Sequence, residues 1–351
     1  MLDRWANYYD DIGLLEERKS AYLAYAKSLI DRKLPVIFDF IHLTRLLGRT
    51  PDYLASAINS PNNHYRSFEI KKKSGGKRKI ISPYPALSET QTWILENILN
   101  KIPIHNFAHG FVNKRSIITN SKLHKGQKEL LKMDLEDFFP SININRIIYI
   151  YKKQGYPNII SFYLASLCCY ENHLPQGAPT SPYLSNLVAI QLDKRLALLS
   201  KKFNLRYTRY ADDLTFSGDK IPTKFIEYVS SIIHNEGFVI NENKTRLYKS
   251  GGKRIVTGVS VATEELKLPR EYKRKLRTEL HYIFTYGLRS HIVKKKIRKP
   301  NYLLSIIGKV NFWLSIEPDN HYASYAINEL RKIQNEIIGT NINDIEAANN
   351  S

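Results

Sequence analysis

Apolar residues along the chain follow two different spacings, and the change from one to the other divides the sequence. From residue 14 to 60, Leu, Ile, Ala and Tyr recur every three or four positions, which predicts helices. The run Ser60-Pro61-Asn62-Asn63 ends that region. After Pro269 the helical spacing returns and continues to a polar end. Between these two helical regions, apolar runs of strand length alternate with helical stretches.

The central part predicts an ordered series of strands and helices. Residues 65–85 predict two strands joined by a turn at Gly75-Gly76. The elements expected after this hairpin are, in order, a helix at 89–101, a buried strand within 130–142, helices at 143–170 and 182–203, two strands within 205–218, a helix at 224–236 and a strand at 252–262. Strand, helix, strand, strand, helix, strand is the ferredoxin-like order. The expected fold class is therefore α+β.

Composition indicates a folded protein and bears on its cellular location. Hydrophobic residues make up 43% of the 351 residues and charged residues 25%, which is typical of globular chains. No apolar run reaches the roughly 18 residues that span a bilayer, and acids occupy the N-terminal stretch where a secretory signal would be basic. The two cysteines, Cys168 and Cys169, are adjacent and cannot join distant segments. We expect a cytoplasmic location and no membrane partner.

Charge points to a polyanionic partner. Lys and Arg number 53 and Asp and Glu 33, a net charge of +20. Residues 267–299 hold twelve Lys or Arg and two Glu, with Tyr and Phe between them. Cations interleaved with aromatic rings are typical of nucleic-acid surfaces. An anionic membrane surface and the ordinary charged face of a helix are the alternatives.

Three aspartates lie in or beside apolar strands, where burial of a charged carboxylate is unfavourable. Asp134 lies in an apolar strand, and Asp212 and Asp213 lie 78 and 79 positions later beside another apolar strand. An Asp-Asp pair by itself is most often a solvated turn. A divalent cation would relieve the repulsion between neighbouring carboxylates, and Mg²⁺ favours a few carboxylates together with substrate phosphates. Two such ions can serve in-line displacement at phosphorus.

Three segments carry a resemblance to a known family. MDLEDFFPSI (133–142), LPQGAPTSPYLSNL (174–187) and RYADDLTFSG (209–218) occur in the order of motifs A, B and C of reverse transcriptases, and the likeness extends from about Tyr65 through Pro318. It implies a right-hand polymerase fold with fingers, a ferredoxin-like palm and an α-helical thumb. The boundaries expected are 1–60 for an N-terminal helical region, 61–125 for fingers with part of the palm, 126–262 for the palm with motifs A to D, and 263–351 for the basic helical thumb.

The resemblance also implies roles at the reacting end of the site. Asp134, Asp212 and Asp213 match the catalytic metal ligands, which would hold two Mg²⁺ ions, with Mn²⁺ as a substitute. Lys244 matches a motif D lysine that would donate a proton to departing pyrophosphate. A surface lysine is the alternative for that position.

Further positions match those that bind the incoming deoxynucleotide. Phe139 corresponds to a bulky residue that excludes a ribose 2′-OH, although core packing would also explain it. The remaining nucleotide-binding positions are Asp137 and Phe138 through their backbone amides, Gln176 and Gly177 in the motif B loop, and Lys72 and Arg78 in the hairpin.

Other segments resemble the retron branch of the family. Asn120-Ser121-Lys122-Leu123-His124 is similar to a retron element, with Ser where the branch has Ala, and Val256-Thr257-Gly258 matches a second element. The resemblance implies RNA binding by Asn120, His124, Val256, Thr257 and Gly258, and by Arg274 and Lys275 of the thumb. Structural roles for Asn120 and His124, and an ordinary strand end for Val256-Thr257-Gly258, are the alternatives.

A retron enzyme would have a specific task. It would bind a structured noncoding RNA of its own locus, start from the 2′-OH of a guanosine, and copy part of that RNA into a branched RNA–DNA molecule, msDNA. Retrons act in defence against phage beside an effector protein. The alternatives are a group II intron-like or diversity-generating reverse transcriptase, a polymerase that works without a template, and a catalytically silent RNA-binding module. Template dependence, a neighbouring noncoding RNA gene and DNA synthesis itself would separate these alternatives.

Overall fold

The computed structural model describes residues 2–71 and 75–349, with side chains through Ile337. The chain divides into two compact units. The first unit comprises Met1–Arg115, Leu131–Phe216 and Ile221–Leu247, and the second comprises Ser116–Leu130, Ser217–Lys220 and Tyr248–Ser351. In the described residues, no helix is both long enough and apolar enough to cross a membrane. The division into fingers, palm and thumb at the expected boundaries stays a prediction.

Helices open the first unit, and those after α1 lie within the region 14–60 where the apolar spacing predicts them. They are α1 (Leu2–Asp11), α2 (Glu16–Asp31), α3 (Phe40–Leu47) and α4 (Pro51–Asn59). Side chains set two of their starts, because Asp39 accepts a hydrogen bond from the backbone N–H of His42 and Thr50 accepts one from that of Tyr53. A short 3-10 helix, η1 (Pro61–Asn63), follows at the predicted break. The 14–60 region is thus divided into short helices, two of them begun by a polar cap.

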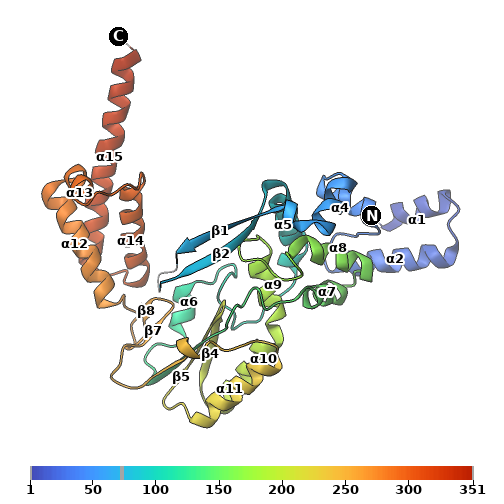
Figure 1. The fold of residues 1–351 in the computed structure, drawn as a ribbon, viewed down its shortest axis with the longest axis horizontal. Helices are drawn as coiled ribbons and strands as arrows, with labels where there is room; N and C mark the ends of the chain where they lie inside the picture. The colour runs from blue at the N-terminus through green and yellow to red at the C-terminus, as the bar shows by residue number, and fades with distance from the viewer. Residues whose placement is uncertain (1, 72–74, 350–351) are drawn as a thin grey trace. The chain divides into compact units, whose positions relative to one another are not determined.

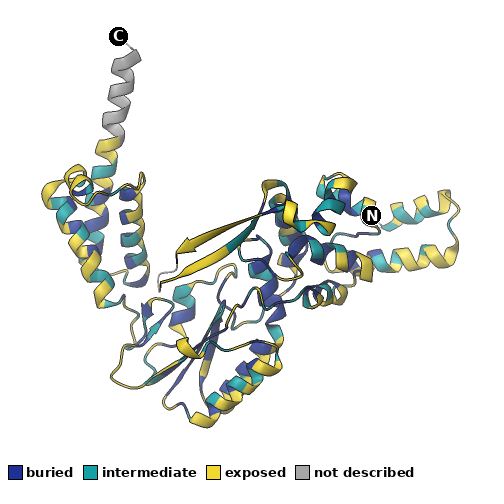
Figure 2. Ribbon diagram, viewed as in Figure 1, coloured by how far each residue is buried: buried dark blue, intermediate teal, exposed yellow. Residues whose placement is uncertain are grey.

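The predicted hairpin is confirmed. Strands β1 (Tyr65–Lys71) and β2 (Lys77–Pro83) pair in antiparallel fashion, with Phe68 opposite Ile80. Most of their residues are exposed (Figure 2). Tyr65 and Pro83 at the base are buried, so the hairpin is anchored at that end.

The ferredoxin-like sheet is also confirmed. Strands β3 (Glu129–Asp134), β4 (Arg206–Tyr210), β5 (Asp213–Gly218) and β6 (Arg246–Tyr248) lie in the order β4-β5-β3-β6. The helices connecting or flanking these strands are α5 (Pro85–Asn97), η2 (Leu99–Lys101), α7 (Ile144–Lys153), α8 (Asn158–Cys168), α9 (Ser181–Val188), α10 (Ile190–Lys202), α11 (Thr223–Asn235) and η3 (Glu242–Lys244). Helix α10 packs against β4 and α11 (Figure 1). Together these elements give the right-hand polymerase architecture its α+β class.

One strand prediction was wrong. Residues 252–262 do not supply the last strand of this sheet, because β6 has that place. The segment instead folds back on itself as β7 (Ile255–Val256) and β8 (Val259–Ser260). Thr257 and Gly258 lie between them with φ of 45° and 86°. Consecutive positive φ values produce a tight reversal, which a strand pattern in the sequence does not reveal.

The helical pattern after Pro269 is confirmed in the second unit. It contains α12 (Arg270–Tyr286), α13 (Leu288–Lys294), α14 (Tyr302–Ile316) and α15 (His321–Asn349), together with α6 (Ile117–Lys122). A core of its own holds these helices, with Leu280, Val310 and Trp313 fully buried. A separate and larger core fills the first unit around the sheet (Figure 2).

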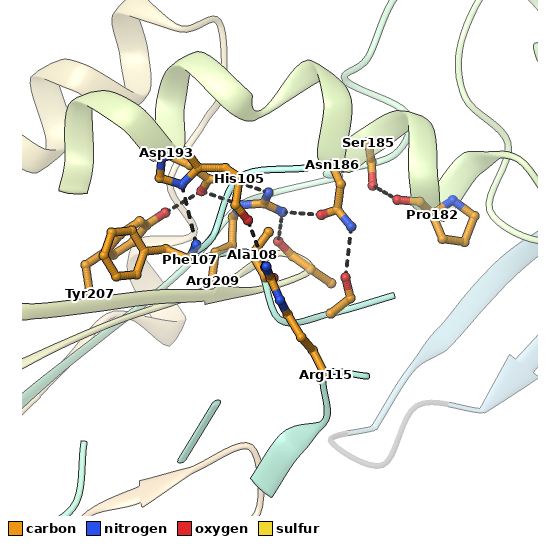
Figure 3. Close-up of polar contacts among 12 residues, drawn as sticks. His105, Phe107, Ala108, Arg115, Pro182, Ser185, Asn186, Asp193, Tyr207 and Arg209 are labelled. Carbon is orange, nitrogen blue, oxygen red and sulfur yellow. Dashed lines mark hydrogen bonds and ion pairs between the residues drawn. The ribbon is translucent and has the colours of Figure 1, made fainter. Parts of the chain in front are cut away.

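A buried ion pair fixes the sheet to its helices. Arg209 on β4 and Asp193 on α10 have no exposed side-chain surface. Nε and Nη2 of Arg209 donate to the two carboxylate oxygens of Asp193 at 2.8 and 2.7 Å (Figure 3). The Tyr207 hydroxyl donates to the same carboxylate at 2.8 Å. A bidentate pair of this kind is both strong and directional.

The same guanidinium reaches the turn that follows β4. Nη1 of Arg209 donates to the side-chain oxygen of Asn186 at 3.0 Å and to the carbonyl of Ala211 at 3.1 Å (Figure 3). The Asn186 amide in turn donates to the carbonyl of Gly110 at 2.8 Å. A Cβ on Gly110 would lie 2.6 Å from the backbone nitrogen of Ala211. The network therefore holds two backbone segments in close contact beside the aspartates.

Replacing Asp193 by Asn should lower the free energy of unfolding by about 3–5 kcal/mol, because it leaves the Arg209 charge buried without its carboxylate. Urea denaturation followed by circular dichroism measures this change. Asp219→Asn is the matched control, since Asp219 pairs with Lys128 on the surface with 84% of its side chain exposed. The control should change stability by less than about 1 kcal/mol. Equal effects of the two substitutions would contradict this role of the buried pair.

Candidate active site

The three aspartates come together at the ends of neighbouring strands. Asp134 is the last residue of β3, Asp212 lies in the turn between β4 and β5, and Asp213 is the first residue of β5. Because β3 and β5 are adjacent in the sheet, their ends meet. The backbone N–H of Leu135 donates to the carbonyl of Asp212 at 3.0 Å, which joins the two ends. Ala211 makes the turn with a φ of 56°, a left-handed conformation that is uncommon outside glycine.

Burial affects the pKa of Asp212 and of Asp213, and the charge of a neighbouring carboxylate adds to the effect. Asp134 is 8% exposed, and Asp212 and Asp213 are half-buried. Burial, followed by the charge of Asp134, raises the pKa of Asp212 above its ordinary value. Burial also raises the pKa of Asp213, against the opposing charge of Lys132. A cation placed among these groups would remove the repulsion between them.

Lys244 provides a positive charge next to these carboxylates. Its Nζ donates to a carboxylate oxygen of Asp134 at 2.6 Å, and this hydrogen bond raises the pKa of Lys244. The lysine lies on η3, and the backbone N–H of Asn241 just before η3 donates to the carbonyl of Asp134 at 2.8 Å. The structure thus brings the predicted motif D lysine to the predicted metal ligands.

The donor set fits a hard divalent cation. All three side chains offer carboxylate oxygens, the ligands that Mg²⁺ and related ions prefer. Within residues 2–71 and 75–349, no three or more His, Cys, Asp or Glu side chains are grouped closely enough to form a metal cage by themselves. Mg²⁺ is usually held by one or two carboxylates and completed by substrate phosphates. The arrangement therefore suits an ion that arrives with a nucleotide.

Two consecutive phenylalanines beside the turn have different environments. Phe138 is buried, with its ring centroid 5.6 Å from that of Phe238 and the Arg209 guanidinium 5.8 Å above it. Phe139 is half-buried, with its ring 6.2 Å from that of Phe111. Asp137 precedes them, exposed, with a φ of 42°. The side chain of Phe138 therefore belongs to the core, and Phe139 keeps an accessible ring.

The motif B loop packs on the hairpin. The backbone N–H of Ile81 on β2 donates to the carbonyl of Gln176 at 3.0 Å. Gly177 has a φ of 137°, and a Cβ there would lie 2.8 Å from the carbonyl oxygen of Ile81. Only glycine fits this approach without displacing backbone. Arg78 is exposed on β2, whereas Lys72 lies outside the described residues.

The predicted RNA-binding residues divide by burial. Asn120 and His124 are fully buried in the second unit. The Asn120 amide donates to the Thr257 hydroxyl at 3.4 Å, and Nδ1 of His124 lies 2.6 Å from the Ser217 hydroxyl. Asn120 thus supports the turn at 257–258 and His124 contacts the end of β5, while RNA binding by either residue stays a prediction.

Some of the other predicted RNA-binding positions lie at the surface of the second unit. Val256 is buried, Thr257 is half-buried and Gly258 is exposed at the tip of the β7–β8 turn. On α12, Arg274 and Lys275 are exposed, and Lys275 pairs with Glu271 at 2.8 Å. Gly258, Arg274 and Lys275 have the exposure that contact with RNA requires.

Sequence reasoning missed the network of Arg209, Asp193 and Asn186 behind the aspartate turn. A signal was available, because Arg209 interrupts a short strand as Asp134 does. A lone arginine has no visible partner in a sequence, and Asp193 lies on a helix whose charged residues are otherwise typical of a surface.

Comparison with known proteins agrees with this geometry. The family described as "Reverse transcriptase (RNA-dependent DNA polymerase)" matches residues 70–278. A retron Ec86 reverse transcriptase of Escherichia coli is 34% identical over 86% of this chain and 92% of its own length. A retron Mx162 reverse transcriptase of Myxococcus xanthus is 37% identical over 62% of this chain and 52% of its own length. A solved telomerase from Candida albicans aligns over 77% of this chain and 63% of its own with a TM-score of 0.45 and 10% identity, a likeness too low to carry an argument.

The family match covers more than half of the chain, and the Escherichia coli relative is matched over nearly its full length. With the converging aspartates and the ferredoxin-like sheet, these findings lead to one conclusion. The chain belongs to the reverse transcriptases, and among them to the retron reverse transcriptases.

Proposed function

We propose that this RNA-directed DNA polymerase joins deoxynucleotides at a Mg²⁺ site formed by Asp134, Asp212 and Asp213. Reverse transcriptases use divalent metal, and the observation that supports this site is that the three aspartates lie where β3 ends and β5 begins, close enough that, after burial, the charge of Asp134 raises the pKa of Asp212. Asp134, Asp212 and Asp213 would hold the ions, whose chemistry would be activation of the attacking hydroxyl and neutralisation of charge on the transferred phosphoryl group. Mn²⁺ would serve as a substitute, because it also accepts oxygen ligands.

The chain's own residues would orient the nucleotide. We propose that the backbone amides of Asp137 and Phe138 face the triphosphate and that Arg78 contacts it from the hairpin. Arg78 suits this role because an exposed guanidinium binds phosphate through two parallel hydrogen bonds. Gln176 and Gly177 would contact the base pair being formed. Lys72 would assist Arg78, but it lies outside the described residues. The proton-donor role of Lys244 stays a prediction.

Phe139 is the proposed sugar gate. Its ring is half-buried beside Phe111, while its neighbour Phe138 is committed to the core. A ring in that position would collide with a ribose 2′-OH and leave room for deoxyribose. Selection would then come from excluded volume and not from a hydrogen bond.

The product we propose is that of a retron. The enzyme would bind a cognate structured RNA, of the type called msr-msd, and extend from the 2′-OH of one guanosine to make msDNA. The similarity to retron reverse transcriptases supports this product. Arg274, Lys275 and the turn at Thr257-Gly258 would contact the RNA, and their exposure supports that role. A role in phage defence with an effector protein, and a cytoplasmic location, complete the proposal.

Asp212→Asn should lower Mg²⁺-dependent DNA synthesis on the copurified RNA at least about a hundredfold, since metal stabilisation contributes several kcal/mol to such reactions. Incorporation of radiolabelled dNTPs measures the loss. RNA binding, followed by filter retention, should remain near wild type, because the substitution keeps the shape of the side chain.

Asp219→Asn is the matched control for this test, because it changes an exposed aspartate that follows β5. Normal polymerisation by Asp212→Asn would refute the metal assignment. Wild-type protein that binds RNA and makes no DNA would instead favour a silent RNA-binding module.

Phe139→Ala should raise ribonucleotide use relative to deoxynucleotide use by about tenfold or more, the discrimination that a pocket gains from excluding one small group. The measurement is the ratio of kcat/KM for dNTP and rNTP. Phe162→Ala removes an exposed ring on α8 and should leave the ratio unchanged. Unchanged sugar selectivity in Phe139→Ala would remove the gate role.

Gly177→Ala should lower kcat/KM for dNTP about ten- to a hundredfold, because the added Cβ displaces the loop from β2 and misplaces the nucleotide. Steady-state kinetics measure it. Gly308→Ala on α14 is the control, since a Cβ there meets nothing within 4 Å. That control should stabilise the helix slightly and leave kinetics unaltered. Wild-type kinetics in Gly177→Ala would show that the close approach has no catalytic consequence.

A further inference from the structure

The second unit contains a cavity with an aromatic wall. It has a volume of about 540 Å³ and lies among α12, α13 and α14. Tyr282, His291 and Tyr302 line it with nearly parallel rings. The ring of His291 makes angles of 18° with Tyr282 and 26° with Tyr302, at centroid distances of 6.1 and 5.8 Å. Tyr286, which is 61% exposed, extends the series beyond Tyr282 at 6.0 Å and 27°.

His291 and Tyr302 are buried, whereas Tyr282 is partly accessible. His291 and Tyr302 are 5% and 8% exposed, and Nε2 of His291 lies 3.0 Å from the Tyr302 hydroxyl. These two side chains satisfy each other, so packing explains them. Tyr282 is half-buried and keeps part of its ring toward the cavity. The cavity is therefore lined by one partly accessible ring, that of Tyr282, whose neighbours in the series are His291 and Tyr286.

Four cations line the same cavity. Lys295, Arg298, Lys299 and Lys309 line the cavity, and Nζ of Lys295 lies 5.9 Å from the centroid of Tyr282. The carboxylate among the lining residues is that of Glu279, which Lys309 pairs with at 2.8 Å. Four cations and one carboxylate leave the lining with a net positive charge, which attracts anions.

We propose that this cavity binds one nucleotide, with its base against Tyr282 and its phosphate against Lys295 and Arg298. Base stacking on an aromatic ring together with cations for the backbone is the chemistry of single-stranded nucleic-acid sites. The volume falls in the range of small-ligand pockets, and the hydroxyls of Thr278 and Ser305 add hydrogen-bonding groups.

The base must be unpaired, because a paired base within a helix keeps both faces stacked on its neighbours. Two sources share this chemistry: an unpaired nucleotide of the bound RNA, and a free nucleotide. The first source rests on the proposed function. The lining residues are separate from those proposed for polymerisation, so the two sites can be tested independently.

The first test is binding of the copurified RNA to full-length variants. Tyr282→Leu keeps apolar bulk and removes the ring, and should weaken binding about five- to a hundredfold, the range found for base–aromatic stacking. Tyr282→Phe keeps the ring face and should bind normally. Lys295→Gln with Arg298→Gln should lower the slope of log Kd against log salt by about one for each phosphate that the variant no longer binds.

Matched controls separate the cavity from general effects. Tyr228→Leu also removes a tyrosine beside a lysine, because Nζ of Lys224 lies 5.8 Å from its ring centroid on α11. Lys27→Gln with Lys152→Gln removes two exposed charges of the first unit. Thermal melting establishes that each variant is folded. If folded Tyr282→Leu binds RNA as well as wild type, or if Tyr228→Leu weakens RNA binding to the same extent, an RNA nucleotide does not occupy the cavity.

Crosslinking distinguishes the two sources. Ultraviolet irradiation of the wild-type complex, followed by mass spectrometry, should give an RNA nucleotide attached within residues 278–309. The second arm uses ATP and dATP with RNA-free protein, and saturable binding that Tyr282→Leu abolishes would assign a free nucleotide. If no crosslink forms there and no nucleotide binds, the inference is overturned.

DNA synthesis by the same wild-type sample separates this inference from the proposed function. Synthesis without a crosslink or nucleotide binding at the cavity refutes the cavity site alone. A crosslink without any DNA synthesis refutes the polymerase proposal and leaves the cavity site standing.

Discussion

The arrangement of the turn at Ala211 and Asp212 depends on the buried pair of Arg209 and Asp193. Two ions without exposed surface are tolerated only when nearly every donor and acceptor is used, and this pair meets that condition through Tyr207, Asn186 and the carbonyl of Ala211. Because each of these hydrogen bonds is directional, the turn has little freedom to shift relative to β4 and α10. The buried pair thus helps to fix the position of the next two residues, Asp212 in the turn and Asp213 at the start of β5.

A second constraint acts on the aspartates themselves. Three carboxylates at the ends of β3 and β5 repel each other, and Lys244 neutralises part of that charge through Asp134. The remaining negative charge suits a divalent ion accompanied by phosphates. The positively charged hairpin and second unit have the opposite task, since they attract the polyanion. Negative charge is concentrated at the three aspartates, and positive charge lies elsewhere in the protein. This separation of charge suits a protein that binds both a metal ion and nucleic acid.

Much of this was predictable from the sequence because its signals are local. Two strand-like segments joined by Gly75-Gly76 predict the hairpin, and alternating strands and helices predict the ferredoxin-like order. The strand β6 was missed because Arg246–Tyr248 is only three residues long and lacks an apolar run. The burial of Asn120 and His124 could not be predicted, since their partners Thr257 and Ser217 lie about 90 or more positions away. The partner of Arg209 could not be predicted for the same reason. Contacts between different helices and strands do not change the spacing of residues along the chain.

The central claim is that this chain copies its own bound RNA into branched DNA. The most direct measurement is to supply dNTPs and Mg²⁺ to the protein purified with its RNA, sequence the product, and treat it with an enzyme that cleaves 2′–5′ linkages. We expect DNA complementary to part of the copurified RNA, attached to it until the 2′–5′ linkage is cleaved. DNA that has no complement in the RNA, or DNA that is free of RNA before cleavage, would contradict the claim.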